Sequence, residues 1–143
     1  MQSAVLIVVK AKPSGKPWQD RVFDLRVDDS ADPLKELRRL VTLQRAYNHM
    51  NAGDLALKRN DNDGALREYS AAARLVPENA ETIYWHAVAL VNMGRVDDAL
   101  PLFRRVFAMD ANWATLTRRL PKSGLLPDDA GLIERIVGVA AGK

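Results

Sequence analysis

The sequence predicts a mainly α-helical fold in which a short stack of helical hairpins follows a β-hairpin. Three observations predict it. A pattern of small and aromatic residues recurs after 34 residues, so that Ala65 returns as Ala99 and Tyr69 as Phe103, and a period of this length is typical of a repeated helix-turn-helix unit. Apolar residues between residues 33 and 140 recur at helical spacing, in segments that caps and turns separate. Two short segments of strand length within the first 28 residues predict the β-hairpin.

The first strand is predicted at residues 4–9, AVLIVV, whose continuous apolar character indicates a strand covered on both faces. Residues 10–17 contain two prolines and a glycine and are expected to form an exposed loop. In residues 20–28, DRVFDLRVD, apolar Val22, Leu25 and Val27 alternate with charged residues, which predicts a half-buried strand. A two-stranded hairpin alone is marginal in water, so the strands should either pack on the helices or belong to a sheet that this chain does not contain. In the second case, a long exposed edge such as AVLIVV invites pairing between chains. We therefore expect the chain to dimerise through its N-terminal strands.

The helices are predicted from the residues that cap their starts and terminate their ends. The first begins after Asp32 as N-cap, with Pro33 at the first helical position. It forms either one long helix to about Arg59 or two helices with a kink near Arg45. The others are expected at residues 63–75, 80–93 and 97–109, from residue 112 or 113 to Pro121, and from Pro127 to residue 140.

The stretch from Gly53 to Ala111 resembles the tetratricopeptide repeat family. Each unit of that family has a small residue, an alanine, an aromatic residue, a second small residue and a proline, in this order. The first copy supplies Gly53, Ala65, Tyr69, Ala72 and Pro77, and the second supplies Ala87, Ala99 and Phe103 but departs at Val106 and Ala111. Both copies lack the family's tryptophan and have His49 and Ile83 instead. The resemblance implies two repeats, with residues 113–140 as a degenerate third unit that caps the stack. We therefore predict a helical domain of residues 30–143 behind a hairpin segment of residues 1–29.

The segments that flank the repeats show a second resemblance. QSAVLIVV, DRVFDLRVDDSADPLKELRRL and LTRRLPKSGLLPDD look like the C-terminal part of a bacterial family of uncharacterised proteins. In that family the preceding domain has the N-terminal-nucleophile hydrolase fold, and the extreme C-terminus carries a region assigned to peptidoglycan binding. The resemblance implies that the chain is a fragment starting at an artificial Met1, whose two strands complete a sheet lying upstream. The nucleophile would lie upstream as well, so no catalytic residue is transferred.

Composition narrows the function classes. The 143 residues are 48% hydrophobic and 27% charged, which is typical of one globular domain. The absence of cysteine excludes disulfides and thiolate metal sites. A net charge of +3 is too small to indicate nucleic acid, and no apolar run is long enough to span a membrane. The N-terminus lacks the basic region of a signal peptide, so we expect a cytoplasmic protein, or a periplasmic one if an upstream segment carries a signal.

No motif indicates catalysis or a bound metal. His49 and His86 occupy inner-helix positions and could approach each other, but a metal site would need a converging carboxylate, and interhelical packing is the favoured interpretation. The turn Asp61–Gly64 is similar to the centre of a calcium loop, yet Arg59 stands where the first ligand should be. A phosphate loop and a nucleophile elbow are absent from the sequence. We therefore predict a chain that is not an enzyme and binds no cofactor.

The concave face of the stack is the predicted binding site, because in this repeat family the first helices of successive hairpins line a groove. The resemblance places nine residues there: Tyr47, Met50, Asp54, Lys58, Glu81, Tyr84, Val88, Asn92 and Arg118. Tyr, Met and Val with a few charges suit an extended peptide or another protein surface. The Lys/Asn/Arg set by which one branch of the family holds a C-terminal carboxylate is missing.

Three alternatives stay open. Two repeats make a shallow groove, which could instead dock on the chain's own upstream domain, since about three repeats are usual for an independent stack. The C-terminal region could bind peptidoglycan, for which Trp85 and Trp113 are the candidate aromatic platforms. The chain could also organise or gate an upstream hydrolase. In every case we expect no nucleic acid and no membrane partner.

Overall fold

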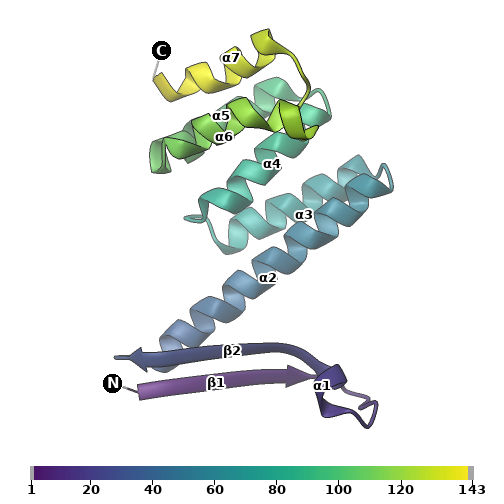
Figure 1. Cartoon of the computed structure of the whole chain (residues 1–143), viewed down its shortest axis with the longest axis vertical. Helices are drawn as coiled ribbons and strands as arrows, with labels where there is room; N and C mark the ends of the chain where they lie inside the picture. The colour runs from purple at the N-terminus through teal and green to yellow at the C-terminus, as the bar shows by residue number, and fades with distance from the viewer. Residues whose placement is uncertain (1, 142–143) are drawn as a thin grey trace. The chain divides into compact units, whose positions relative to one another are not determined.

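A computed structural model describes residues 2–141, and its elements are labelled in Figure 1. The predicted fold class is confirmed, since the chain is mainly helical and a two-stranded antiparallel hairpin precedes a helical repeat stack. Two compact units divide between Arg45 and Ala46. This boundary lies within helix α2 (Pro33–Lys58) and not after residue 29, so the first half of that helix belongs with the hairpin.

The hairpin consists of β1 (Gln2–Val9) and β2 (Arg21–Ser30), with Leu6 opposite Leu25. Residues 10–16 are exposed and lie in no helix or strand, as expected for the connecting loop, and a short helix, α1 (Pro17–Asp20), follows before β2. The buried carboxylate of Asp20 holds this connection, since its two oxygens each accept the backbone N–H of Ser14 at 2.9 Å. This local bond draws the connection into a fixed turn.

Only one face of the hairpin is covered within the described residues. Ala4, Leu6 and Val8 of β1 are half-buried, whereas Val5 and Ile7 keep 55% and 46% of their surface exposed. The prediction that this strand is covered on both faces is therefore wrong for the described chain.

Val22 was expected on the inner face but is exposed. The register shifts between Val8 and Val9, where residue 22 is the extra residue of a bulge in β2. Val22 points outward because it neighbours Phe23, which lies on the inner face of β2 with Leu25 and buried Val27. The bulge brings Arg21, opposite exposed Val9, to the outer face as well.

Helix α2 is continuous, which confirms the one-helix alternative. Its start is capped by Asp32, whose carboxylate accepts the N–H of Lys35 at 3.0 Å. Leu37 and Val41 line a cavity together with Leu6 of β1. These residues all belong to the first unit.

The second unit contains three helical hairpins in succession. The second half of α2 pairs with α3, α4 pairs with α5, and α6 with the 3₁₀ turn η1 precedes α7. The bounds are α3 (Asn62–Leu75), α4 (Ala80–Asn92), α5 (Val96–Met109), α6 (Asn112–Arg119), η1 (Leu120–Ser123), α7 (Ala130–Gly138) and a final 3₁₀ turn η2 (Val139–Ala141). Asp61 caps α3 and Asn79 caps α4, in each case by accepting an N–H three residues on.

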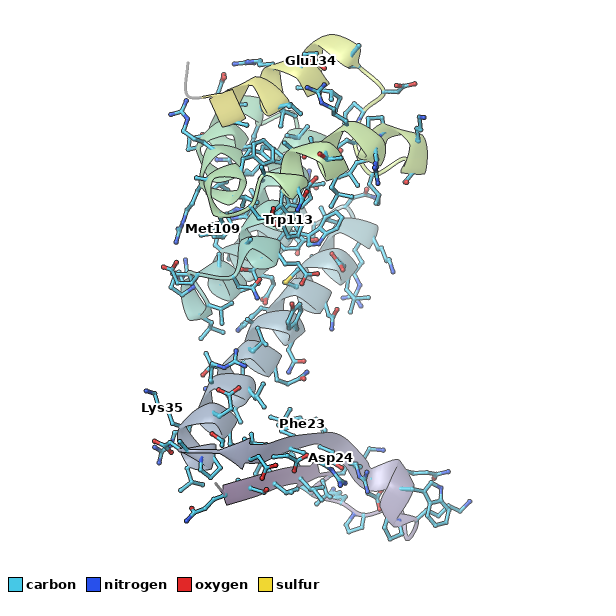
Figure 2. All side chains as sticks on the ribbon, turned by 60° about the vertical axis from the view of Figure 1, so that its left-hand side comes forward. Phe23, Asp24, Lys35, Met109, Trp113 and Glu134 are labelled. Atoms are coloured by element: carbon cyan, nitrogen blue, oxygen red, sulfur yellow. The ribbon has the colours of Figure 1, made fainter. Side chains whose placement is uncertain are left out.

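Equivalent positions of the two repeats are buried alike. Ala65 and Ala99 are fully buried. Of the two equivalent aromatic residues, Phe103 is fully buried and Tyr69 is 3% exposed. Tyr84 lies at the centre of the larger core, with its ring centroid 5.6 Å from that of Phe103 and 4.6 Å from that of Trp113. Figure 2 shows Trp113 within the stack and Glu134 at its surface.

Candidate functional site

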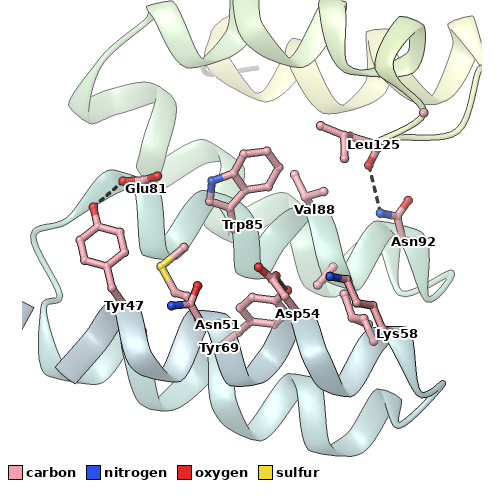
Figure 3. A pocket seen from close by; sticks show the side chains of 14 residues that line it. Tyr47, Asn51, Asp54, Lys58, Tyr69, Glu81, Trp85, Val88, Asn92 and Leu125 are labelled. Carbon is pink, nitrogen blue, oxygen red and sulfur yellow. Dashed lines mark hydrogen bonds between the residues drawn. The ribbon is translucent and has the colours of Figure 1, made fainter. Parts of the chain in front are cut away.

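The second unit carries a groove of about 560 Å³ between the second half of α2 and helix α4. Figure 3 shows its two walls, with Tyr47 and Glu81 at one end and Lys58 and Asn92 at the other. Tyr69 of α3 contributes to its lining, and so does Leu125, which follows η1.

The walls are made by the same positions of the two repeats. Residues 34 apart face one another in four pairs: Tyr47 and Glu81, Asn51 and Trp85, Asp54 and Val88, and Lys58 and Asn92. Along each helix these positions are spaced by three or four residues, which keeps them on one face. The 34-residue period therefore explains why both helices present matching rows to the groove.

The lining of the groove is apolar at its centre. Val88 and Met50 are almost fully buried, and Trp85 is half-buried and packs against the core clusters to which they belong. Trp85 meets the ring of Tyr84 edge to face, with centroids 5.4 Å apart and an interplanar angle of 77°. Because this contact fixes the indole on its core side, Trp85 offers a preset apolar surface on its groove side.

Two tyrosine–carboxylate pairs set the polar character of the groove. Tyr47 donates its hydroxyl to Glu81 at 2.5 Å, and this hydrogen bond is the main cause that raises the pKa of Tyr47. Tyr69 donates to Asp54, and burial, followed by this bond, raises the pKa of Tyr69. Both hydroxyls therefore stay protonated near neutral pH and hold the carboxylates in place.

The remaining polar groups lie at the other end. Asn92 donates its side-chain amide to the carbonyl oxygen of Leu125 at 3.0 Å, which joins α4 to the segment after η1. Among the described residues that line the groove, Lys58 is the sole cation, and it lies at the end opposite Glu81. The groove is thus acidic at its Glu81 end and basic at its Lys58 end.

The structure brings seven of the nine predicted residues together at the groove: Tyr47, Met50, Asp54, Lys58, Glu81, Val88 and Asn92. Tyr84 and Arg118 do not line it. Tyr84 is fully buried and shares a 2.9 Å hydrogen bond with the hydroxyl of Thr117. Arg118 lies on α6 and pairs with Glu134 of α7 instead.

The error at Tyr84 has a simple geometric cause. Successive residues of a helix differ by about 100° in direction, so Tyr84 points into the core when Trp85 points into the groove. The sequence left this choice open, because residues 81, 84, 88 and 92 fit the spacing of one helical face as well as residues 81, 85, 88 and 92 do. Trp85 was predicted only as a platform for sugars, and Asn51 and Leu57 were missed.

The two histidines serve helix packing. His49 of α2 lies 2.6 Å from a carboxylate oxygen of Glu68 on α3, measured from its Nδ1 atom. His86 stacks on Tyr69, with centroids 6.4 Å apart, and burial lowers its pKa, with a smaller contribution from Arg95. Within residues 2–141, groups of three or more side chains suited to holding a metal ion are absent. In the same residues, every helix is too short or too polar to cross a membrane.

A comparison with protein families agrees with this arrangement of helical hairpins. The model of the tetratricopeptide repeat matches residues 56–120. The matched residues include α3, α4, α5 and α6, so the match supports a tetratricopeptide-like helical domain in the second unit. Tetratricopeptide repeats generally mediate protein–protein interactions, and this agrees with a non-catalytic interaction module. A search of curated proteins found no match to the chain.

Proposed function

We propose that this chain is a non-catalytic interaction module that binds an extended protein segment in the groove between α2 and α4. The observation that carries the proposal is the lining itself, in which an apolar centre formed by Trp85 and Val88 is bordered by fixed polar groups. Such a combination of apolar contact and a few oriented polar groups is typical of a binding site. The tetratricopeptide-like hairpins supply the rigid walls.

The size of the groove sets the length of the ligand. The wall from Tyr47 to Lys58 is about 16 Å long at a rise of about 1.5 Å per helical residue. An extended peptide advances about 3.3 Å per residue. The groove therefore accommodates about five residues of an extended chain.

The charges of the lining set the direction of the ligand. Glu81 lies at one end and Lys58 at the other, with the apolar centre between them. A ligand with a basic residue, an apolar residue and an acidic group in this spatial order matches all three parts. Opposite charges placed at the two ends mainly determine the direction and specificity of binding.

A peptide selection with the full chain tests the proposal. We expect selected peptides of this pattern to bind, and Trp85→Ala to weaken binding by about tenfold or more, because central aromatic residues dominate binding energy. Trp18→Ala is the matched control, since Trp18 is 71% exposed and lies on α1, in the other unit. It should leave the affinity unchanged in isothermal titration.

A second variant separates binding from folding, because Trp85 also packs on Tyr84. Lys58→Glu changes a residue of the lining that is not buried and should reverse the preference for an acidic group at that end. If the selected peptides bind both variants as tightly as they bind the unmodified chain, the groove assignment is refuted. Binding only to a separate domain of the same polypeptide would identify an internal docking surface. Retention on insoluble peptidoglycan that Trp85→Ala does not alter would replace the proposal with glycan binding elsewhere on the chain.

A further inference from the structure

The outer edge of β1 is an unpaired row of backbone donors and acceptors. Within residues 2–141, β2 is the only strand that pairs with β1. The N–H of Lys10 donates to the carbonyl oxygen of Asp20 across the hairpin at 2.8 Å. Because backbone groups alternate in direction along a strand, those of Val8 and Leu6 also point at β2. The N–H and C=O groups of Val5, Ile7 and Val9 therefore point away from β2.

Nothing in the strand opposes pairing along this edge. Residues 2–9 contain no charged side chain and no proline, which are the usual features that protect an edge strand. Both register shifts leave β1 regular, because the extra residues lie in β2. Asp29, in one of these shifts, has a φ of +48°.

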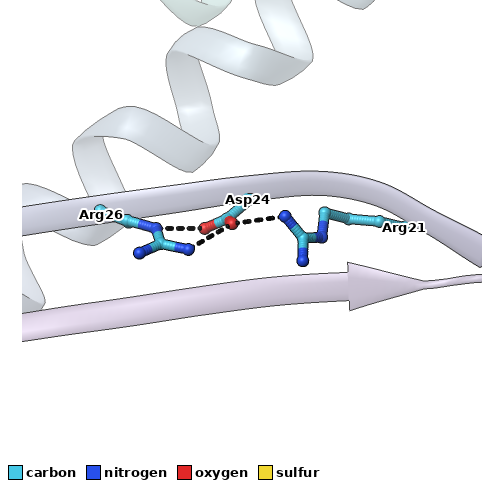
Figure 4. A network of polar contacts seen from close by, with 3 residues as sticks. All are labelled: Arg21, Asp24 and Arg26. Carbon is cyan, nitrogen blue, oxygen red and sulfur yellow. Dashed lines mark hydrogen bonds and ion pairs between the residues drawn. The ribbon is translucent and has the colours of Figure 1, made fainter. Parts of the chain in front are cut away.

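The charges of the hairpin's outer face all lie on β2. Arg21 and Arg26 both pair with Asp24, as Figure 4 shows, at 3.1 Å and 2.9 Å. These residues stand opposite Val9, Val5 and Ile7 of β1. The outer face thus has a row of ion-paired charges on β2 and an uncharged row on β1.

We propose that two copies of this chain pair through the free edges of their β1 strands, antiparallel and centred on Leu6, to form one continuous sheet. This register sets Val5 opposite Ile7 of the partner subunit. The backbone N–H and C=O groups that point to the free edge of one strand then meet those of the other strand. It sets Gln2 opposite Lys10 of the partner subunit, so that no two like charges face each other. The uncharged rows meet at the centre, and the ion-paired rows of β2 lie outside. A second copy fits because the edge is self-complementary under a twofold axis.

The buried surface of such a pairing is small compared with a standard interface, so the association is expected to be weak. Sedimentation velocity of the full chain between about 10 µM and about 1 mM should show monomers converting to dimers, a range chosen for a weak interface. Amide exchange over the same range should slow at Val5, Ile7 and Val9 as concentration rises. Exchange at Leu6 and Val8 should not depend on concentration, because those amides are already paired within the hairpin.

Two substitutions of one residue distinguish edge pairing from other contacts. Ile7→Pro removes an edge N–H without removing a bond to β2, and proline is tolerated where an edge N–H faces outward. It should weaken dimerisation about tenfold or more, because it removes hydrogen bonds on both sides of the axis. Ile7→Lys should do the same, whereas the matched control Val22→Lys, at an exposed position on β2, should dimerise like the unmodified chain.

The outcomes are distinct. Loss of dimers with Ile7→Lys but not with Ile7→Pro would indicate packing of outer faces and overturn edge pairing. Monomers at every concentration, with amides of Val5 and Ile7 exchanging freely, would overturn the proposal in wild-type protein without any variant. Circular dichroism of each variant shows whether the helical stack remains folded.

Discussion

Replacing Gly53 by alanine should destabilise the helical stack, although alanine is the better helix former. Gly53 lies inside α2, against the ring of Tyr69 on α3. A Cβ atom at residue 53 would lie 3.0 Å from Cζ of that ring and 3.1 and 3.2 Å from Cε1 and Cε2. The ring cannot move away easily, because its hydroxyl donates to Asp54 and its face stacks on His86.

Two opposing contributions set the magnitude. An extra methyl group in a well-packed core costs about 1–3 kcal/mol, and three ring atoms at close contact suggest about 2 kcal/mol. Alanine in place of glycine inside a helix gains about 1 kcal/mol. The expected net loss of unfolding free energy is therefore about 1 kcal/mol, or a fall in Tm of about 3 °C for a chain of this length.

The assay is urea denaturation followed by circular dichroism at the helical signal. Gly138→Ala is the matched control, since Gly138 is the last residue of α7 and a Cβ there would meet no atom within 4 Å. It should be neutral or slightly stabilising. In a Tyr69→Leu background the ring atoms near Gly53 are gone, so Gly53→Ala should then stabilise, with a coupling free energy of about 2 kcal/mol. A stabilising Gly53→Ala in the unmodified chain, or no coupling with residue 69, would refute the reasoning.

Two further predictions concern the core and the pH dependence. Tyr84→Phe should lower the unfolding free energy in urea by about 1 kcal/mol, because it removes one hydrogen bond to Thr117. The hydroxyl of Thr117 keeps its own bond to the carbonyl oxygen of Trp113 at 2.8 Å, and a loss above about 3 kcal/mol would contradict this account. Burial lowers the pKa of His86 below its ordinary 6.5, so the unfolded chain binds its proton first as pH falls. The stability linked to His86 is therefore complete above about pH 6.5 and lost below it. His86→Gln should reduce the fall in Tm between about pH 7.5 and 5.5, and an unchanged fall would count against this.

The helical elements could be predicted because their signals are local. Asp32 and Asn79 are side chains that cap a helix within three residues, and both do so. The 34-residue period carried more information than single helices, since it fixed which residues of the two repeats occupy equivalent places. Ala65 and Ala99 could thus be assigned to the core from their spacing alone.

The choice between Tyr84 and Trp85 could not be settled by that period. Both residues are compatible with helical spacing from Glu81, and what decides between them is distant in sequence. Phe103 of α5 and Trp113 of α6 receive the ring of Tyr84 and leave Trp85 to the groove. Tertiary packing therefore decides which face of α4 lines the groove, and no local sequence pattern indicates it.

The hairpin itself was predicted, but the exposure of its outer face was not, since its first strand has no periodicity to interpret. A continuous run of apolar residues fits a strand covered on both faces and a strand covered on one. The bulge at Val22 is not marked by glycine or proline. A one-residue displacement of this kind reverses the side chains beyond it, which places Arg21 on the outer face opposite Val9.

The equivalence of the repeats also explains why the α2 wall of the groove carries the carboxylate of Asp54 where the α4 wall has the apolar Val88. In the first repeat Tyr69 of α3 reaches past Gly53 and donates to Asp54. In the second repeat the residues 34 positions later are Phe103, Ala87 and Val88. The hydroxyl and the carboxylate are thus present together in one repeat and absent together in the other. A buried hydroxyl without its acceptor would be costly, so the two polar groups must change as a pair. The same small-and-aromatic pattern that builds the stack therefore determines which wall carries a carboxylate at this position of the groove.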